Sequence, residues 1–271
     1  MARYKTFDNI FETMRYPAGE SHVRMRTDVD ISEVDVIEAM TFSFDDLAQI
    51  ITADRIIGRL GHEIEWFLPY FPFARHDRRN DSLDGFELGL AIEMVSRLQV
   101  VIADPHSDVA GQLPHFDQAN VVAAFERVGL FDSDPVVVIP DAGATKKAYT
   151  WLDGRRVVQA SKRRDPATGK LSGFSVPDVD SEGNSIAGRP CIIVDDICDG
   201  GGTFLGLAAE LQAAGAGPLT LAVTHGLFTK GTEVLTESFS TIACLAPTDA
   251  PETPGVITIP FEDLYTKGTA I

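Results

Sequence analysis

The stretch 189–205, RPCIIVDDICDGGGTFL, combines an apolar run, three carboxylates and a run of glycines. The apolar residues 191–194 predict a buried parallel strand, and the residues from 204 onward begin an amphipathic helix. In open α/β sheets a strand, a glycine-rich turn and a helix start form a phosphate site, because glycines let backbone N–H groups approach an anion. The candidate binding residues of this turn are Asp195, Asp196, Asp199, Gly200, Gly201, Gly202 and Thr203.

The paired carboxylates, Asp195 and Asp196, would repel a phosphate bound directly beside them. They fit a ligand if they hold sugar hydroxyls, or if they act through a divalent cation that also touches the ligand. A ribose phosphate with Mg²⁺ meets both conditions. The alternative is an ordinary strand-to-helix turn whose acidic residues serve solubility.

Four further loops carry charged groups where predicted strands end, which is where open α/β sheets place ligands. The arginines of 75–79 are suited to grip nucleotide phosphates, and His106 is suited to ligate a metal or donate to a phosphate. The turn 140–147 repeats the acid and glycine pattern, so its helix start is suited to a diphosphate and its Asp141 to Mg²⁺. The cations of 162–164 open a polar segment that is expected to form a mobile flap over a transferring phosphoryl group. Each loop also has a structural explanation, as a solvated charge run, an exposed histidine or a capped helix.

The bulk properties limit the classes of function. The chain has 271 residues, 44% of them hydrophobic, which suffices for one large or two medium domains with a full core. Its formal net charge of -17 disfavours a nucleic-acid partner and requires local cations or metal ions for anionic substrates. Three cysteines without metal-ligand spacing indicate a reducing compartment. No signal peptide or membrane-length apolar run is found, so a cytoplasmic protein without a membrane partner is expected.

Strands alternate with helices along the chain, which predicts an α/β fold with two domains, each a mostly parallel sheet flanked by helices. The pattern restarts around 117–135. The expected domains are 1–118, completed by 251–271, and 119–250. The predicted strands are 34–40, 63–70, 100–103, 136–139, 155–160, 191–194, 219–223, 241–245 and 256–259, and the predicted helices begin at 43, 86, 120 and 204.

Taken in order, these loops resemble the phosphoribosyl diphosphate synthetase (ribose-phosphate diphosphokinase) family, with this chain as a shortened and divergent member. The resemblance runs from Tyr16 to Ile259, and its specific motifs are YFPFARHDRR at 70–79 and VDDICDGGGT at 194–203. It implies two phosphoribosyltransferase-like domains, MgATP as donor, and a homo-oligomer, either a dimer or a hexamer. It also implies transfer of the β,γ-diphosphate of ATP to the anomeric hydroxyl of ribose 5-phosphate, which gives phosphoribosyl diphosphate and AMP. Nucleotide biosynthesis and NAD metabolism are the expected pathways.

The resemblance implies a role for each matching residue on the ATP side. Arg75, His76 and Asp77 would face ATP. Tyr16 and Glu20 would approach the adenine, from the same or a neighbouring subunit. No GxxxxGK[ST] loop is present in the sequence, so ATP must be held in another way.

The resemblance also implies the metal and catalytic residues. His106 and Asp141 would hold Mg²⁺. Lys162 and Arg164 would stabilise the transition state at the β-phosphorus, and His106 is counted with them as catalytic. This assignment is physically coherent, because phosphoryl-type transfer depends on alignment and charge neutralisation.

On the acceptor side, the resemblance gives the ribose hydroxyls to Asp195 and Asp196, and the 5-phosphate to residues 199–203. Gly200 departs from the family, which has Thr at this place. The change removes a hydroxyl that bonds the 5-phosphate, and it is expected to open space there. The alternative acceptor is therefore a ribose with a larger 5-substituent, such as ADP-ribose.

Two other functions compete with a diphosphokinase. A phosphoribosyltransferase would share the turn 193–203, but it has no use for YFPFARHDRR or for the cations of 162–164. A non-catalytic regulatory homologue should have lost those cations or His106, and this chain retains them.

Overall fold

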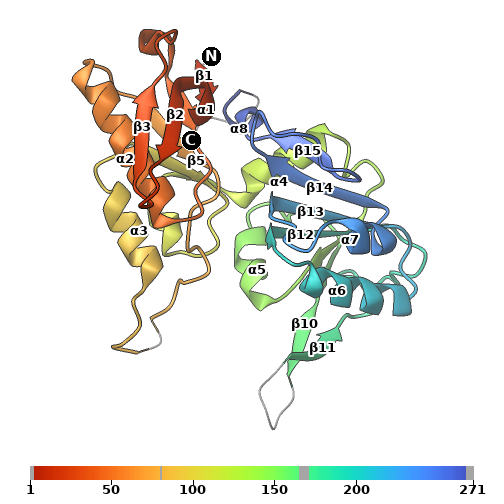
Figure 1. Ribbon diagram of the computed structural model, residues 1–271. Helices are drawn as coiled ribbons and strands as arrows, with labels where there is room; N and C mark the ends of the chain where they lie inside the picture. Colours follow the sequence, from red (N-terminus) through yellow and green to blue (C-terminus); the bar gives the residue numbers. More distant parts are fainter. Residues whose placement is uncertain (1–2, 80, 165–170, 267–271) are drawn as a thin grey trace. The chain divides into compact units, whose positions relative to one another are not determined.

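The computed structural model describes residues 3–79, 81–164 and 171–266, with the backbone alone at 162–164 and 171–172 (Figure 1). The chain divides into two compact units. Unit 1 consists of Met1–Asp117, Pro247–Asp249 and Phe261–Ile271, and unit 2 of Gln118–Ala246 and Ala250–Pro260. Within the described residues, no helix has the length and apolar character needed to span a membrane.

The sheet of unit 1 is parallel throughout, in the order β1-β4-β5-β6-β7. Every residue of β4 and β6 is buried, as expected for a parallel sheet covered by other elements. The predicted mostly parallel sheet is therefore confirmed. The strands are β1 (Tyr4–Thr6), β4 (Val36–Glu38), β5 (Glu65–Leu68), β6 (Val100–Ala103) and β7 (His115–Phe116), and the helical segments are α1 (Phe7–Ile10), η1 (Ile31–Glu33), α2 (Phe44–Arg59), α3 (Glu87–Val95), η2 (Ala110–Gln112) and α8 (Glu262–Thr266).

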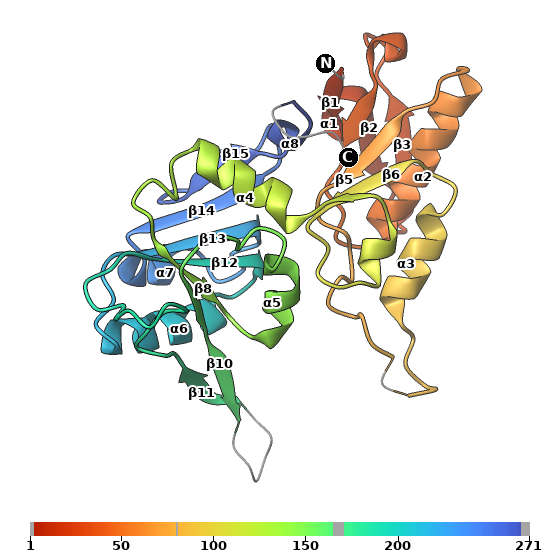
Figure 2. The ribbon, with the colours of Figure 1, turned by 180° about the vertical axis from the view of Figure 1, so that it is seen from behind.

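Helix α2 shows how local sequence sets an element of unit 1. The Ser43 side chain accepts from the Asp46 N–H at 3.3 Å, and the Asp46 carboxylate accepts from the Ser43 N–H at 2.9 Å. This reciprocal pair is a capping box, which satisfies backbone donors at the helix start. Figure 2 shows α2 and α3 on the same side of the sheet. The stripe of α2 that is buried in the core is Leu47, Ile50, Ala53 and Ile57.

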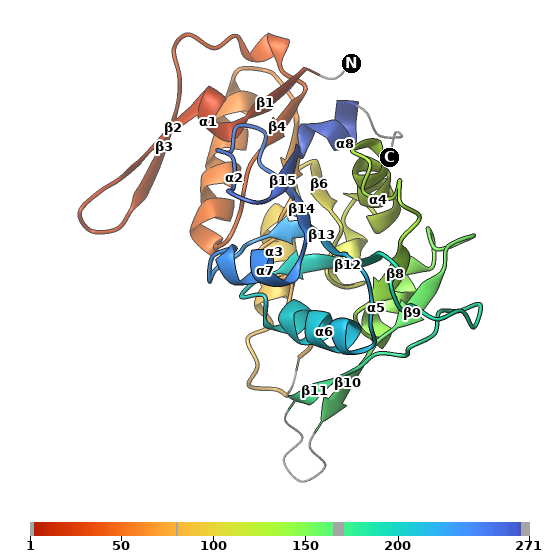
Figure 3. The same cartoon turned by 90° about the vertical axis from the view of Figure 1, so that its right-hand side faces the viewer.

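A two-stranded hairpin, β2 (Phe11–Arg15) and β3 (Ser21–Met25), extends away from the sheet of unit 1 (Figure 3). Its turn is closed by the Tyr16 N–H, which donates to the Glu20 carbonyl at 2.9 Å. Gly19 lies in this turn at φ +96°, a conformation that favours glycine. β2 and β3 are not among the strands predicted from the sequence.

Glu38 is a buried carboxylate that ties a late segment of the chain to the first sheet. It accepts from the Tyr4 hydroxyl at 2.6 Å, and from the backbone N–H and hydroxyl of Thr248 at 3.1 and 2.6 Å. Burial nevertheless raises the pKa of Glu38 above its ordinary value. The free energy cost of burying the charged carboxylate is larger than the stabilisation that these hydrogen bonds give to it. Glu38 thus links β4, β1 and the segment at Thr248 within unit 1.

Replacing Glu38 with Gln is expected to change how stability depends on pH. A folded-state pKa above the unfolded value means that the folded state binds the proton more tightly. The protonated carboxyl therefore contributes to the free energy of unfolding. This contribution is fully present below the unfolded pKa of 4.5 and is lost as the pH rises through the folded pKa. Urea unfolding at several pH values should therefore show the wild type losing stability relative to E38Q as the pH rises. Parallel profiles for the two proteins would contradict this account.

The sheet of unit 2 is also parallel, in the order β15-β14-β13-β12-β8-β9. β12 runs beyond the predicted 191–194 and includes both members of the acidic pair. β15 pairs with β14, which places its residues in unit 2. The strands are β8 (Val136–Ile139), β9 (Val157–Gln159), β12 (Cys191–Cys198), β13 (Leu219–Gly226), β14 (Thr241–Ala246) and β15 (Ile257–Pro260), and the helices are α4 (Gln118–Arg127), α5 (Ala142–Ala148), α6 (Gly202–Ala213) and α7 (Glu233–Ser238).

The segment expected to form a flap contains an antiparallel hairpin, β10 (Ser161–Arg164) and β11 (Leu171–Ser175), which projects from unit 2 (Figure 1). Its base is anchored by Phe174, which is buried and lies against Gly206 of α6. A Cβ atom at position 206 would lie 2.5 Å from the Phe174 ring, so glycine is what permits this contact. The side chains of Lys162 and Arg164 lie outside the described part of the structure.

Candidate functional site

Three neighbouring strands of unit 2 carry the polar turns of the candidate site. β8, β12 and β13 are adjacent and parallel, so the turns at their carboxyl ends lie on the same edge of the sheet. These turns are 140–141, 199–203 and 227–231. Ligands of open α/β sheets bind at this edge.

One of the two adjacent carboxylates of β12, Asp196, forms an ion pair with a lysine of α5. The Lys147 ammonium lies 3.1 Å from the Asp196 carboxylate. The Asp196 side chain is only 8% exposed and that of Lys147 23%, so the ion pair is largely withdrawn from water. Asp195 accepts a hydrogen bond from the Asp196 backbone N–H at 2.9 Å. The lysine therefore offsets negative charge that would otherwise be buried beside a second carboxylate.

Asp195 has a pKa well above its ordinary value, caused first by burial and then by the negative charge of Asp196. The charge of Lys147 acts in the opposite direction. Carboxylates held side by side in this way offer several acceptor oxygens toward one edge of the sheet. Such a pair is suited to accept hydrogen bonds from vicinal sugar hydroxyls.

The glycine turn after β12 has the geometry of an anion-binding loop. Gly201 has φ +76°, and a Cβ atom there would lie 3.0 Å from Leu235 Cδ2, so both conformation and space favour glycine. α6 begins at Gly202, and the backbone N–H groups of its first turn lack helical partners. With the positive end of the helix dipole, these donors suit a phosphate group.

Asp141, at the end of β8, caps helix α5. Its Oδ1 atom accepts from the backbone N–H groups of Gly143 and Ala144 at 2.9 and 3.1 Å. The donors expected to meet a diphosphate at this helix start are thus turned toward the chain's own carboxylate. The same cap sets the direction of α5, from which Lys147 reaches Asp196.

In unit 1, Arg75, His76 and Asp77, which are expected to face ATP, lie in the segment after β5. Arg75 and His76 are exposed, and Asp77 is half-buried. His76 Nδ1 lies 3.1 Å from the Glu87 carboxylate, at the start of α3. The hydrogen bond to His76 is the main cause that lowers the pKa of Glu87. This contact holds the loop to the helix that follows it.

The loop after β6 begins at Asp104, which is buried and has φ +41°. His106 follows it and is half-buried. Because β5 and β6 are neighbours, the loops that carry His76 and His106 follow adjacent strands. Tyr16 and Glu20 lie elsewhere, on the exposed turn of the β2–β3 hairpin.

The two predicted metal ligands belong to different units, His106 to unit 1 and Asp141 to unit 2. Within residues 3–79, 81–164 and 171–266, no group of three or more His, Cys, Asp or Glu side chains is arranged to hold a metal ion. The three cysteines, Cys191, Cys198 and Cys244, are free and buried, and burial raises the pKa of each thiol.

The expectation that Gly200 opens space beside the phosphate turn is wrong. A Cβ atom at this position would lie 3.2 Å from both Cδ and Cε of Lys230. The space is therefore occupied by the lysine's aliphatic stem. Sequence reasoning gave no role to Lys230, to Lys147 or to Glu87. The sequence shows a lysine near each acidic turn. It does not show which carboxylate or backbone position that lysine meets in the folded protein.

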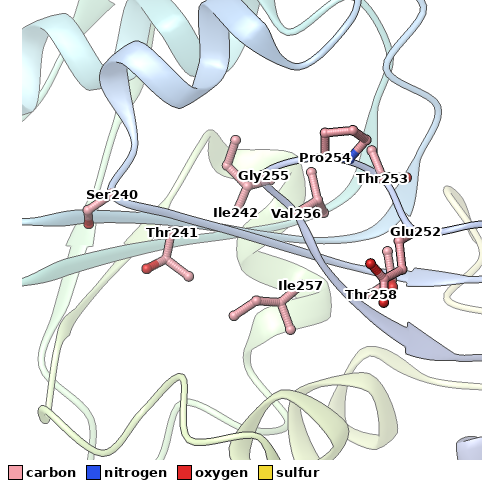
Figure 4. Close-up of a pocket in the computed structure, with 10 residues that line it drawn as sticks. All are labelled: Ser240, Thr241, Ile242, Glu252, Thr253, Pro254, Gly255, Val256, Ile257 and Thr258. Carbon is pink, nitrogen blue, oxygen red and sulfur yellow. The ribbon is translucent and has the colours of Figure 1, made fainter.

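A cavity of about 790 Å³ lies at the opposite end of the sheet of unit 2 (Figure 4). It is formed by the starts of β14 and β15 and the segment between Glu252 and Val256. Glu252 is the one ionisable residue in its lining, which otherwise consists of small polar and apolar groups. Among the described residues, this lining contains no Lys, Arg or His that could neutralise a phosphate.

Comparison with known proteins gives one consistent result. A ribose-phosphate pyrophosphokinase of Methanopyrus kandleri is 30% identical over 250 residues, which cover 85% of this chain and 81% of that protein. One of Mycobacterium tuberculosis is 29% identical over 194 residues, and this chain spans only 57% of its length. No family model matches the chain. The crystal structure of phosphoribosylpyrophosphate synthetase from Mycobacterium smegmatis has the same fold, with a TM-score of 0.72, 23% identity, and coverage of 95% of this chain and 88% of that one.

Proposed function

This chain belongs to the ribose-phosphate pyrophosphokinase family, and from that premise we propose that it transfers the β,γ-diphosphate of MgATP to the anomeric hydroxyl of a ribose 5-phosphate. The products would be phosphoribosyl diphosphate and AMP. The observation that carries this proposal is the turn from β12 to α6, where two carboxylates stand directly before a glycine loop and a helix start. A sugar phosphate needs both features: carboxylates for its hydroxyls, and a glycine loop with a helix start for its phosphate.

The acceptor would bind along this turn. Asp195 and Asp196 would accept hydrogen bonds from the ribose hydroxyls, and the ammonium of Lys147 offsets the negative charge of Asp196. The 5-phosphate would lie against Asp199, Gly200, Gly201, Gly202 and Thr203, at the N-terminus of α6.

The donor side would use Arg75, His76 and Asp77 for ATP, with Tyr16 and Glu20 near the adenine. Carboxylate and phosphate oxygens are the donors that Mg²⁺ prefers, and it commonly takes only one or two protein carboxylates. Asp141, a carboxylate at the binding edge of unit 2, fits that chemistry, and His106 is the second proposed ligand. When bound, Mg²⁺ would neutralise charge on the diphosphate.

In the reaction, the anomeric oxygen forms a bond to the β-phosphorus, and the bond from that phosphorus to the oxygen of AMP breaks. The anomeric hydroxyl gives up its proton to solvent. Lys162 and Arg164 would offset the charge that develops on the transferring group. The resemblance that assigns these roles also favours a homo-oligomer, a dimer or a hexamer, in the cytoplasm.

Phosphorus NMR of the full chain with MgATP and ribose 5-phosphate tests the proposal. The expected result is loss of the ATP signals together with the appearance of AMP and of an anomeric diphosphate. A parallel sample with phosphoribosyl diphosphate and a nucleobase tests phosphoribosyl transfer. Reaction in the second sample alone would overturn the proposal in favour of a phosphoribosyltransferase. Reaction in neither would leave the regulatory homologue.

ADP-ribose is the second candidate acceptor, because Gly200 lacks the side chain that normally contacts the 5-phosphate and a long cationic side chain lies there instead. A third NMR sample, with ADP-ribose in place of ribose 5-phosphate, compares the two directly. A strong preference for ribose 5-phosphate would remove ADP-ribose as the acceptor.

A further inference from the structure

Lys230 lies against the phosphate turn, and the backbone fixes it there. The loop after β13 follows the end of β12: the N–H groups of Leu227 and Phe228 donate to the Cys198 carbonyl at 2.9 and 3.1 Å. The Thr229 N–H donates to the Asp199 carbonyl at 3.1 Å. Residues 227–229 are thus hydrogen-bonded to residues 198–199, and Asp199 directly precedes Gly200.

The side chain of Thr229 adds a second link. Its hydroxyl donates to the Asp199 carboxylate at 2.6 Å. The turn that follows is tight, because the Gly231 N–H donates back to the Phe228 carbonyl at 2.8 Å and Gly231 has φ +78°. The backbone of Lys230 is therefore held beside Gly200.

The contact with Gly200 involves the stem of Lys230 and leaves its charge in solvent. A Cβ atom at position 200 would meet Cδ and Cε of the lysine at 3.2 Å, and Cγ at 3.5 Å. Lys230 itself is exposed. A lysine can pack its aliphatic stem against the protein and keep its ammonium group in water. In this arrangement the positive charge of Lys230 lies next to the glycine turn.

The charge balance of the turn gives this cation a use. Asp195 and Asp196 precede the turn that would bind a phosphate dianion, Asp199 lies at its start, and the chain as a whole carries -17. A cation beside the turn offsets that repulsion and can donate to a phosphate oxygen.

We propose, on the basis of the function proposed above, that Lys230 binds the 5-phosphate ester of the acceptor and takes the place of a side-chain hydroxyl at position 200. The chemistry it recognises is a phosphate ester at ribose C5. Ribose 5-phosphate and ADP-ribose both present that group, and they are the two probes that separate a terminal phosphate from a bridging diphosphate.

The test is calorimetric titration of ribose 5-phosphate, ADP-ribose and unphosphorylated ribose into the full chain. K230M keeps an unbranched stem against Gly200 but removes the charge, whereas K230R keeps the charge. K230M is expected to raise the Kd of a phosphorylated acceptor about tenfold, as for one charge-assisted hydrogen bond, while K230R stays within about threefold. The matched control is K5M, which removes an exposed lysine from β1 in unit 1.

A compensating variant separates charge from packing. G200T supplies the missing hydroxyl, and the short side chain of K230A leaves room for it, so the double variant G200T/K230A should recover most of the affinity that K230A loses. The Kd for MgATP should be the same in all variants. If K230M binds both phosphorylated acceptors as tightly as the wild type, the role of Lys230 is refuted.

The outcomes distinguish this proposal from the proposed function. A wild type that forms AMP and an anomeric diphosphate, with K230M unaffected, refutes Lys230 alone. A wild type that binds ribose phosphates more tightly than K230M does, yet forms no AMP, supports Lys230 and refutes the diphosphokinase. A wild type that binds neither acceptor refutes both.

Discussion

Replacing Lys162 with Ala is expected to lower kcat of the proposed diphosphokinase about a thousandfold. A cation that meets the transferring phosphoryl group acts mainly in the transition state, and removal of such a group typically costs about 10³-fold or more. The KM values for MgATP and ribose 5-phosphate should change by less than about fivefold, because ground-state binding is left to other residues. Steady-state kinetics that follow AMP formation would measure both quantities.

The structure gives a reason to expect that Lys162 can act at the ribose-phosphate turn. It lies in β10, opposite Phe174 of β11 in the strand register. Phe174 is anchored on Gly206 of α6, and α6 begins at the glycine turn. The base of the hairpin is therefore fixed to the helix whose N-terminus would bind the 5-phosphate.

R163A is the matched control, since it removes one positive charge from the same strand. The family resemblance gives Arg163 no role of its own, so its loss is expected to lower kcat by less than about tenfold. Equal losses in K162A and R163A would show that the hairpin contributes only general positive charge. A rise in KM with an unchanged kcat would mean that Lys162 binds substrate and transition state equally, and would refute its role in the transition state.

The chemistry of the site was predictable where it resides in consecutive residues. The acidic pair and glycines of 195–203 are adjacent in sequence, and the apolar run before them is long enough to predict a strand. The strand-to-helix turn then follows from local sequence, and β6 and β8 lie at the predicted positions. Alternation of strands and helices was enough to predict parallel sheets.

The partners of those residues were not predictable, because they come from distant parts of the chain. Lys147 meets Asp196 across 49 residues, and Thr229 meets Asp199 across 30. Nothing in the local pattern selects these partners, since each depends on which strands become neighbours. The effect of Gly200 was misjudged for the same reason: the space that a missing side chain leaves depends on Lys230.

The N-terminal hairpin escaped prediction for a different physical reason. β2 is buried only at Phe11, and its other four residues are exposed. A strand that is solvated on both faces shows no alternation of apolar and polar residues, and alternation is the signal on which strand prediction rests.

Lys147 is expected to be a large single contributor to the stability of unit 2. Removing one partner of a buried ion pair leaves an uncompensated charge and typically costs about 3 kcal/mol or more. K147M keeps most of the side-chain volume, so the stability that it loses reports on the missing charge. Urea unfolding at neutral pH should show this loss. D196N removes the other partner and also relieves the repulsion with Asp195, so it should cost less.

The double variant K147M/D196N completes a cycle that isolates the pair. It should be more stable than the sum of the single losses predicts, with a coupling energy of about 2 kcal/mol, because Asp196 is then no longer a buried charge without its cation. Additive losses would mean that the 3.1 Å contact contributes nothing to stability.

The pH dependence of K147M gives an independent check. The charge of Lys147 lowers the pKa of Asp195, which burial and Asp196 raise, so removing it raises that pKa further. A raised folded-state pKa stabilises the fold at low pH, and that stabilisation is lost as the pH rises above the unfolded value of 3.8 and through the folded pKa. The deficit of K147M relative to wild type should therefore be smallest in acid and grow toward neutral pH. A deficit that stays constant with pH would assign the loss to packing, and Lys147 would then have no electrostatic effect on Asp195.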